Sequence, residues 1–395
     1  MPSFFLPAFV AGAFVLVLVA RLLRGRFFAR FIGVIFTITL LITWPLADRL
    51  GPVEPIVSWV AAASLVHFGS LIRAKMRPVW VRVLINWPAS WGIAGVFLAL
   101  PWAITDAFGY DLPGLWVPFA LAAAGVAESL WPRRRTVDVV LDGEDVGDTS
   151  RPWRSPAPPE TRPLRIVQIT DPHLGPFMSA DRLHGISQRA VAAEPDIVLL
   201  TGDYMTMESH HDVEGLSHGL APLAALPGRV FACRGNHDLE SPETVDIAME
   251  RIGATLLNDD AAVVETPVGP VQIVGHDFAW RDRAERMAAT NAAHPRVGDA
   301  LRLVLLHDPG AFAHLDPDDA DLVFSGHTHG GQLGLVSLGL QWTVLRALSR
   351  IPDHGLHARG RARLFVHRGT GHYGFPVRIG VPPEEPVLRV FDRRG

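Results

Sequence analysis

The stretch Phe324-Ser325-Gly326-His327-Thr328-His329-Gly330-Gly331-Gln332 follows an apolar run that begins near Asp321. Two histidines two positions apart, with glycines on both sides, therefore stand where a buried strand is expected to end. Glycine permits the sharp backbone turn that lets neighbouring side chains face one centre. Taken alone, the pair is a modest signal. Its meaning depends on whether carboxylates, other histidines and an amide follow other strands upstream.

Four other polar clusters also come directly after apolar strands. They are Asp171-Pro172-His173 after Leu164–Thr170, Gly202-Asp203 after Asp196–Thr201, Gly235-Asn236-His237-Asp238 after Val230–Cys233, and His307-Asp308 after Leu301–Leu306. Helical patterns alternate with the strands, at Ser179–Ala193 and in a helix that Ser241-Pro242 opens and Gly253 closes. The pattern predicts an α/β domain whose hairpins indicate a layered or mixed sheet. Ligands bind outside the carboxyl ends of strands in such sheets, so we expect the five loops to converge.

The residue types in these loops suit a pair of divalent metal ions, which need a bridging carboxylate and a shell of oxygen and nitrogen ligands. The candidate ligands are Asp171, His173, Asp203, Asn236, His307, His327 and His329. Cys233 is the only cysteine, so the chain has no cysteine metal cluster and no internal disulfide. A mixed nitrogen and oxygen shell favours Mn, Fe or Zn over soft-metal sites or sites built from oxygen alone.

The order of these motifs resembles the calcineurin-like metallophosphoesterase family over residues 164–392. The stretch 326–332 and the tail around 366–384 are similar to its membrane-associated bacterial branch, which includes phosphodiesterases and a UDP-diacylglucosamine pyrophosphatase. The resemblance implies a four-layer α/β sandwich of mixed sheets flanked by helices. It also implies a metal-dependent phosphoric ester hydrolase with two divalent ions. Two departures are Pro172, between the first two ligands, and His372, in a segment that is usually small.

The resemblance also implies a role for each site residue. Asp171, His173 and His329 would hold the first metal, Asn236, His307 and His327 would hold the second, and Asp203 would bridge both. His237 would protonate the leaving oxygen, a step typically worth ~10²–10⁴-fold, and Asp238 would orient it. Three further residues, Arg368, His372 and Arg378, are either substrate-phosphate contacts or part of a solvated basic surface, and Arg234 is another phosphate-contact candidate.

The first third of the chain is almost entirely apolar, which explains much of the 49% hydrophobic content. Its apolar stretches are Phe4–Ala20, Phe31–Ala47, Pro55–Ile72, Val83–Thr105 and Leu115–Leu130. A spanning helix needs ~20 mostly apolar residues, so we expect about five transmembrane helices. The first stretch lacks the basic start and small-residue cleavage site of a signal peptide. Loops one and three and the segment after residue 132 are rich in arginine, which predicts an external N-terminus and a cytoplasmic C-terminus.

These observations divide the chain into residues 1–135, a transmembrane domain, 136–163, a first strand and linker, and 164–395, the metallophosphoesterase domain. The expected protein is a multi-pass enzyme of the inner (plasma) membrane with its catalytic domain in the cytoplasm. Its expected partners are the lipid bilayer and a phosphorylated small-molecule or lipid substrate. A net charge of -4 without a basic stripe gives no reason to expect nucleic acid.

Two alternatives to a lipid-directed phosphodiesterase or pyrophosphatase remain at this stage. One is a membrane receptor or transporter accessory protein whose metallophosphoesterase domain is regulatory. Such a domain would be expected to lose ligands or the acid, whereas this chain has His237 and all seven ligand positions filled. The other, less favoured, is a nuclease or cyclic-nucleotide phosphodiesterase. The apolar N-terminal third, the negative net charge and the lack of a basic stripe argue against the nuclease.

Overall fold

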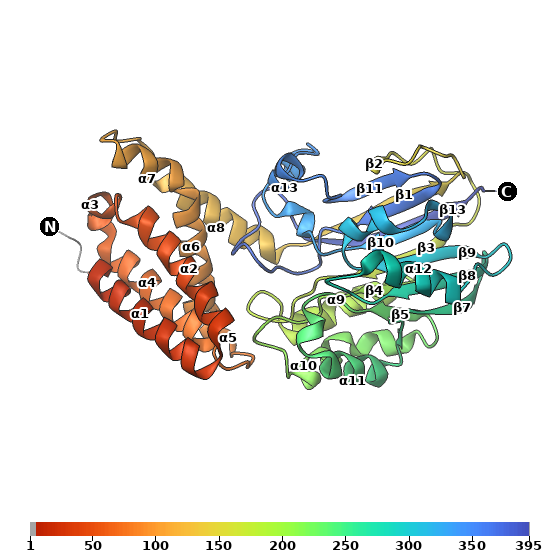
Figure 1. The fold of residues 1–395 in the computed structure, drawn as a ribbon, viewed down its shortest axis with the longest axis horizontal. Coiled ribbons are helices and arrows are strands. Elements are labelled where there is room, and N and C mark those ends of the chain that lie inside the picture. Colours follow the sequence, from red (N-terminus) through yellow and green to blue (C-terminus); the bar gives the residue numbers. More distant parts are fainter. Residues whose placement is uncertain (1–4, 395) are drawn as a thin grey trace. The chain divides into compact units, whose positions relative to one another are not determined.

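The computed structural model describes residues 5–394 and divides the chain into two units (Figure 1). A helical unit contains the residues up to Leu130 together with Tyr373–Ile379, and an α/β unit contains Trp131–His372 and the residues from Gly380 onward. The unit boundary thus falls a few residues before the predicted one at 135. The short C-terminal segment within the helical unit has no counterpart in the sequence-based division.

The helical unit is built from apolar helices in the order that the sequence predicts. They are α1 (Phe5–Leu23), α2 (Arg26–Thr43), α3 (Ala47–Leu50), α4 (Glu54–Ser70), α5 (Val79–Val81), α6 (Trp87–Leu98), α7 (Leu100–Ala107) and α8 (Trp116–Leu130). A π-helical turn, Arg82–Asn86, joins α5 to α6. Each predicted stretch coincides with α1, α2, α4, the α5-to-α7 run or α8, although Phe4 lies outside the described residues.

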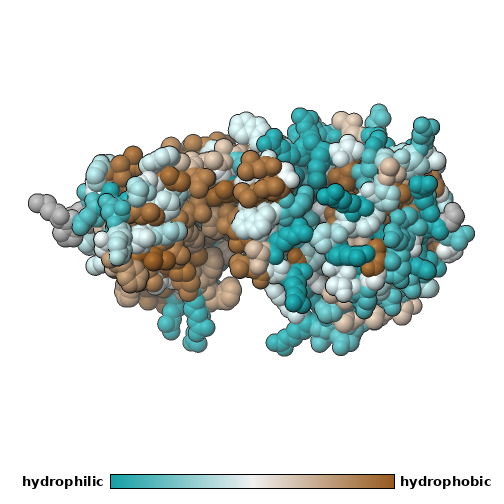
Figure 2. All heavy atoms as spheres, turned by 90° about the horizontal axis from the view of Figure 1, so that it is seen from above, coloured by the Kyte–Doolittle hydropathy of each residue, from teal (hydrophilic) through white to brown (hydrophobic). Residues whose placement is uncertain are grey.

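Among residues 5–394, three helices are long and apolar enough to cross a membrane, namely Leu6–Leu23, Arg26–Thr43 and Val79–Leu98. Helix α8 is apolar but has only 15 residues, and α4 has 17. The count of five spans therefore stays a prediction. Many large apolar side chains of the unit are exposed, and Figure 2 shows brown patches over its surface. Such a surface is typical of helices that face lipid.

The segment Tyr373–Ile379 packs among the helices of this unit. Val377 is fully buried in a cluster with Ala94 of α6 and Ala122 of α8, and Phe375 packs against the same cluster. The backbone also approaches α8 closely, because a Cβ on Gly125 would lie 2.6 Å from the carbonyl oxygen of Arg378. A side chain at position 125 would therefore displace the segment.

The α/β unit contains two mixed sheets. The first has the order β1-β13-β3-β4-β5-β6 and the second β2-β11-β12-β10-β9-β8-β7. The strands of the first sheet are β1 (Arg133–Leu141), β13 (Glu384–Asp392), β3 (Leu164–Ile169), β4 (Ile197–Thr201), β5 (Val230–Cys233) and β6 (Thr255–Leu256). Those of the second are β2 (Arg151–Pro152), β11 (Gly355–Arg359), β12 (Ala362–Val366), β10 (Leu322–Ser325), β9 (Leu301–Leu306), β8 (Gly269–His276) and β7 (Asp260–Thr266).

The inner faces of the two sheets form one hydrophobic core. Ile166 and Leu199 of the first sheet pack with Leu303 and Phe324 of the second, and all four side chains are fully buried. The outer face of the second sheet buries a separate cluster that includes Met287 of α12 (Arg283–Ala293). Helices α9 (Ala180–Ala192), α10 (Val213–Leu220) and α11 (Pro242–Ile252) pack together beside the first sheet (Figure 1). The predicted four-layer sandwich of mixed sheets and flanking helices is confirmed.

Several local predictions can be checked against the helix ends. The hydroxyl of Ser179 accepts a hydrogen bond from the backbone N–H of Arg182, as expected for a cap of α9. Gly253 ends α11 in the left-handed conformation, with φ of 69°. Ser241 occupies the N-cap position of α11 but makes no capping bond, because its hydroxyl donates to the carbonyl oxygen of His210. It therefore ties the loop after β4 to the start of α11.

Candidate metal centre

The carboxyl ends of β3, β4 and β5 in one sheet and of β9 and β10 in the other carry the predicted ligands. Strands β3, β4 and β5 run parallel to one another, and so do β9 and β10. Their five following loops therefore meet at one end of the sandwich. Six of the seven predicted ligands gather there in two groups, Asp171 with His173 and His329, and Asp203 with His307 and His327.

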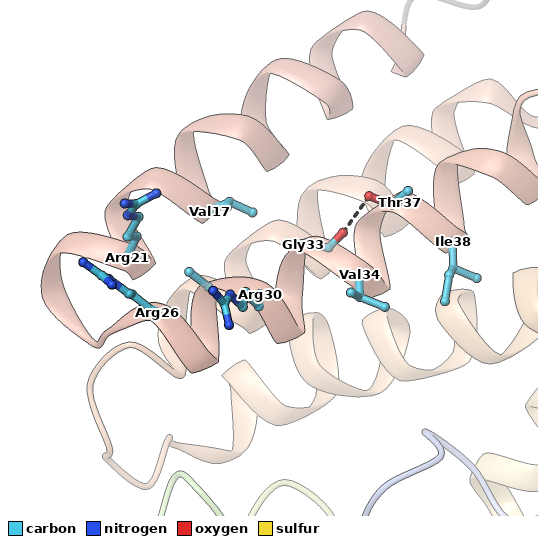
Figure 3. Close-up of a pocket in the computed structure, with 9 residues that line it drawn as sticks. Val17, Arg21, Arg26, Arg30, Gly33, Val34, Thr37 and Ile38 are labelled. Atoms are coloured by element: carbon cyan, nitrogen blue, oxygen red, sulfur yellow. Dashed lines mark hydrogen bonds between the residues drawn. The ribbon is translucent and has the colours of Figure 1, made fainter.

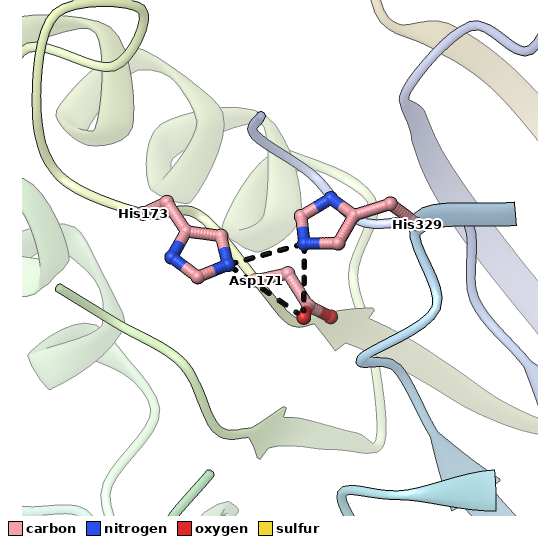
Figure 4. A group of neighbouring side chains, drawn as sticks. All are labelled: Asp171, His173 and His329. Carbon is pink, nitrogen blue, oxygen red and sulfur yellow. Dashed lines mark hydrogen bonds and ion pairs between the residues drawn. The ribbon is translucent and has the colours of Figure 1, made fainter. Parts of the chain in front are cut away.

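The first group is enclosed by protein. Nε2 of His173 lies 3.1 Å from Nε2 of His329, and the same two atoms lie 3.9 Å and 3.5 Å from Oδ1 of Asp171 (Figure 4). The Asp171 carboxylate is held by the Thr170 hydroxyl, which donates to Oδ2, and by the backbone N–H of His327. Two imidazole nitrogens and one carboxylate at this spacing are a donor set for a transition-metal ion.

The second group shares a carboxylate with the first. Oδ2 of Asp203 lies 3.3 Å from Nε2 of His307 and 3.6 Å from Nε2 of His173. Its other oxygen, Oδ1, accepts a hydrogen bond from the backbone N–H of His237. One oxygen of Asp203 thus lies between the two groups, where a bridging ligand belongs.

Asn236, the seventh predicted ligand, follows β5. Its Oδ1 atom is buried and has no hydrogen-bond partner among residues 5–394. A buried acceptor without a partner costs about 1–3 kcal/mol, so its presence calls for an explanation. Because oxygen donors of this kind bind divalent cations, a metal ion at the second group would supply the missing partner. The donor set and this acceptor together fit two metal ions.

The hydrogen bonds of the ligand histidines leave the correct nitrogen available. Nδ1 of His173 lies 3.1 Å from the carbonyl oxygen of Met205, and Nδ1 of His307 lies 2.7 Å from that of Thr201. A carbonyl oxygen only accepts, so in each ring Nδ1 carries the hydrogen and Nε2 presents its lone pair as a ligand for a cation. Burial lowers the pKa of His173 to about 3 and of His327 to about 4, which keeps both rings neutral at pH 7.

The backbone at the ligands is strained. Nine described residues other than glycine have positive φ, and five of them are predicted ligands: Asp171, His173, Asp203, His327 and His329. Such conformations cost on the order of 1–3 kcal/mol each and persist where a function requires them. Glycine is needed beside them, since a Cβ on Gly326 would lie 2.0 Å from Oδ2 of Asp171. The folded protein therefore accepts backbone strain at these residues, and the strain keeps the predicted metal-binding side chains in one arrangement.

His237 and Asp238 have different surroundings. The His237 ring lies 5.4 Å from the His173 ring, and its Nδ1 is 3.9 Å from Oε1 of Glu240. The Asp238 side chain is fully buried and accepts hydrogen bonds from the backbone N–H groups of residues 203, 204 and 235. Burial raises the pKa of Asp238 to about 7. These bonds join the loop after β4 to the loop after β5.

The structure also changes the view of the arginines near the C-terminus. Arg368 is buried and forms an ion pair with Glu384, 2.9 Å away, which Arg135 contacts at 2.7 Å. Arg378 is fully buried within the helical unit. The interpretation of these two residues as a solvated basic surface is therefore wrong. Arg234, the other candidate, pairs with the carboxylate of Asp246.

The sequence did not predict that the segment 369–371 supports the first group through hydrogen bonds to the backbone of Thr170 and Asp171. The backbone N–H of Thr370 donates to the carbonyl oxygen of Thr170, and that of Gly371 donates to the carbonyl oxygen of Asp171. A Cβ on Gly371 would lie 1.9 Å from the carbonyl oxygen of Pro172, so only glycine fits. The Gly-Thr-Gly pattern at 369–371 was the available signal, but it does not say which strand the segment braces.

Comparisons with known proteins agree with this geometry. A family model described as calcineurin-like phosphoesterase matches residues 164–331. Phosphodiesterase YaeI of Escherichia coli (strain K12) is 29% identical over 233 residues, which cover 58% of this chain and 82% of its own. UDP-2,3-diacylglucosamine pyrophosphatase LpxG of Chlamydia trachomatis is 28% identical over 284 residues, with 57% and 83% covered. A transmembrane protein with metallophosphoesterase domain of Danio rerio is 27% identical over 293 residues, with 70% and 61% covered.

Proposed function

We propose that the chain is a membrane-anchored, metal-dependent phosphoester hydrolase that acts on a lipid-linked or amphipathic substrate. The match of residues 164–331 to a calcineurin-like phosphoesterase model and the phosphodiesterase and pyrophosphatase relatives support this proposal. The bond cleaved is a phosphodiester or a pyrophosphate. The catalytic domain faces the cytoplasm. The observation that carries the proposal is the position of Asp203 Oδ2 between the two ligand groups, 3.3 Å from His307 Nε2 and 3.6 Å from His173 Nε2.

The proposed roles follow from the contacts of each side chain. Asp171, His173 and His329 would hold one ion, Asn236, His307 and His327 would hold the other, and Asp203 would be shared by both. Divalent cations such as Mn, Fe or Zn, when bound, supply the activation of water and of the phosphoryl group. His237, beside the first group and 20% exposed, donates a proton to the leaving oxygen. Asp238 keeps the two ligand loops in register through its backbone hydrogen bonds, and so positions His237.

The amphipathic substrate rests on two supports. Three helices in the described part of the chain are long and apolar enough to span a bilayer, which would keep the catalytic unit near lipid headgroups. One relative carries a name that specifies a diacylated sugar nucleotide as its substrate. Substrates of this class present a phosphate or pyrophosphate at the membrane surface, where a tethered hydrolase meets them at high local concentration.

The cytoplasmic location rests on the charges of the loops. Arg21, Arg24, Arg26 and Arg30 flank the turn between α1 and α2, and Arg133, Arg134 and Arg135 follow α8. Short loops rich in arginine stay on the cytoplasmic side. Reporter fusions to the C-terminus test this directly: a cytoplasmic reporter should be active there and a periplasmic one inactive. The opposite result would reverse the proposed sidedness.

The enzymatic test uses the full chain in detergent micelles, stripped with a chelator and reloaded with Mn²⁺, Fe²⁺ or Zn²⁺ in turn. We expect hydrolysis of an aryl phosphodiester and faster hydrolysis of a diacylated sugar nucleotide than of the same nucleotide without acyl chains. Asp203→Ala should abolish both activities, whereas Asp299→Ala, an exposed carboxylate, should abolish neither.

The outcomes separate the parts of the proposal. Equal rates on the acylated and unacylated nucleotides would refute the proposed lipid substrate but not the hydrolase activity. Metal-dependent binding of these compounds without turnover, with every metal, would favour the regulatory domain instead. Activity that survives Asp203→Ala would refute the bridged metal centre.

A further inference from the structure

A groove of about 560 Å³ lies between α1 and α2 in the helical unit. Its two ends differ in character (Figure 3). Arg21, Arg26 and Arg30 line the end near the turn between the helices, and Val17, Ala29, Gly33, Val34, Thr37 and Ile38 line the rest. The volume falls within the ~300–1,000 Å³ of typical small-molecule sites. The groove thus joins a cationic end to an apolar one.

Within the described part of the chain, the three arginines of the groove have no carboxylate partner. No ion pair of Arg21, Arg26 or Arg30 occurs among residues 5–394, and the first acidic residue of the chain is Asp48. Arg49, beyond the other end of α2, is a contrast, because it contacts Asp111 at 2.8 Å and Asp106 at 3.7 Å. The protein neutralises that guanidinium itself and leaves three charges at the groove for an external anion.

The start of α2 adds to the positive potential at this end. Helix α2 has 18 residues and begins at Arg26, its N-cap is Gly25, no side chain caps it, and no acidic residue lies in its first turn. The first N–H groups of a helix lack intrahelical partners and carry the positive end of its dipole. A phosphate at the groove would therefore meet both guanidinium groups and a helix N-terminus.

The apolar end is shaped to receive a hydrocarbon chain. Gly33 leaves space, because a Cβ there would lie 3.8 Å from the Val17 side chain and meet nothing closer. The Thr37 hydroxyl donates to the carbonyl oxygen of Gly33, so it needs no external partner. Val34 is 57% exposed and Ile38 is 40% exposed, although both are apolar. A water-soluble phosphate compound would leave this half of the groove uncovered.

We propose that this groove is a binding site for an anionic phospholipid, with the headgroup phosphate at Arg21, Arg26 and Arg30 and one acyl chain along Gly33, Val34 and Ile38. Basic pockets between transmembrane helices on the cytoplasmic side bind such headgroups. The arginine-rich turn lies on the side that the loop charges assign to the cytoplasm. Arginine suits this role because its planar fork binds a phosphate through two parallel hydrogen bonds.

The test uses the full chain in nanodiscs and native mass spectrometry to count lipids that remain bound after release. The probes are discs of phosphatidylglycerol and phosphatidylcholine with identical acyl chains. The wild type should retain phosphatidylglycerol in preference to phosphatidylcholine. Changing all three arginines to glutamine should lower the retained phosphatidylglycerol by about tenfold or more. Gly33→Leu, which fills the apolar half without changing charge, should lower it as well.

Two matched variants control for charge and topology. The lysine triple Arg21→Lys, Arg26→Lys and Arg30→Lys keeps the loop charge and insertion but loses the bidentate contact, so its retention should fall between wild type and the glutamine triple. A second glutamine triple at Arg73, Arg133 and Arg134 removes the same charge outside the groove and should retain lipid like the wild type. Equal loss in both glutamine triples, or equal retention of the two lipids by the wild type, would overturn the site. So would a dimer that Gly33→Leu disrupts in lipid-free detergent, because a second copy would then fill the groove.

Discussion

The two ligand groups of the metal centre differ in how the protein encloses them. In the first, Asp171, His173 and His329 are all at least 95% buried. In the second, Asp203 and His307 are as deeply buried, but His327 and Asn236 are partly exposed. The first group is therefore enclosed by protein, whereas the second opens toward solvent.

The supports of the two groups differ in the same way. The Asp171 carboxylate receives hydrogen bonds from the side chain of Thr170 and the backbone of His327, and its own carbonyl is held by Gly371. In the second group, Asn236 leaves one oxygen without a protein partner among residues 5–394. The carboxylate of the first group thus has protein partners already, whereas a cation would supply the missing partner of Asn236 in the second.

Substitution of Asp203 is expected to have the largest effect, because it damages both ligand groups at once. Asp203→Ala deletes the one side chain that both groups share, so both ions should be lost and hydrolysis should fall by about 10⁴-fold. Metal content per chain, measured by mass spectrometry after gel filtration, should drop from two ions toward none. Asp299→Ala serves as the control. Retention of two ions in Asp203→Ala would show that the carboxylate does not bridge.

His237 tests whether a residue beside the first group acts in chemistry rather than in metal binding. His237→Gln should leave two ions in place but slow hydrolysis by about 10²–10³-fold for an alkyl leaving group, which needs a proton. With a nitrophenyl leaving group, which departs as a stable anion, the loss should be much smaller. Rates for the two esters measure this directly. An equal loss for both would remove His237 from the role of proton donor.

The neighbouring residues His327 and His329 separate the two groups within one loop. His329→Ala should release the first ion and His327→Ala the second, each leaving about one ion per chain. The ion that remains in His327→Ala occupies the enclosed group, so it should resist chelation about tenfold longer than the one in His329→Ala. Timed chelation with metal analysis gives both rates. Equal rates would contradict the difference in enclosure.

The smallest expected effect concerns the support of the first group. Burial would raise the pKa of Glu384, but Arg135 and Arg368 hold it well below its usual range. Its stabilising contribution is therefore complete above the unfolded value of about 4.3 and is lost as the pH falls below it. Glu384→Gln should lower stability by about 3 kcal/mol at pH 7 and make it less dependent on acid pH.

Thermal unfolding at pH 7 and pH 3 measures this effect, with the exposed Glu265→Gln as control. The backbone N–H of Glu384 donates to the carbonyl oxygen of Gly369, just before the segment that braces Asp171. The first ion should accordingly be retained less well in Glu384→Gln, and the second should be unaffected. An unchanged unfolding temperature at pH 7 would mean that the buried ion pair contributes no net stability.

Much of the fold and the positions of the ligands were open to prediction from sequence. The strands at Leu164–Thr170, Asp196–Thr201 and Leu301–Leu306 are rich in Leu, Ile and Val, which is typical of strands buried on both faces. Each is followed at once by the polar cluster that lies at its carboxyl end. Local order along the chain is therefore enough to place Asp171, Asp203 and His307 at one edge of the sandwich.

Other features depend on chain segments that are far apart in sequence. Whether Arg368 is solvated or buried is decided by Glu384 and Arg135, and the latter lies more than two hundred residues upstream. The hydrogen bonds of Asp238 could not be predicted either. They come from backbone N–H groups, which every residue except proline has, so the residue types around Asp238 do not reveal them. The left-handed backbone at His327 and His329 could not be predicted from residue type either, since only a few per cent of residues other than glycine adopt it, although histidine does so more often than most.

Because Tyr373–Ile379 belongs to the helical unit, that unit is not formed by one continuous segment of the chain. The polypeptide passes between the units three times, near residues 130, 372 and 379, rather than once. In a fragment that starts after α8, the helices that cover Phe375 and Val377 would be missing. The apolar segment would then be exposed to solvent and prone to aggregation. The helical unit therefore cannot be removed without affecting a segment near the C-terminus. Exchange of membrane anchors between such proteins by recombination would have to replace this distant heptapeptide at the same time.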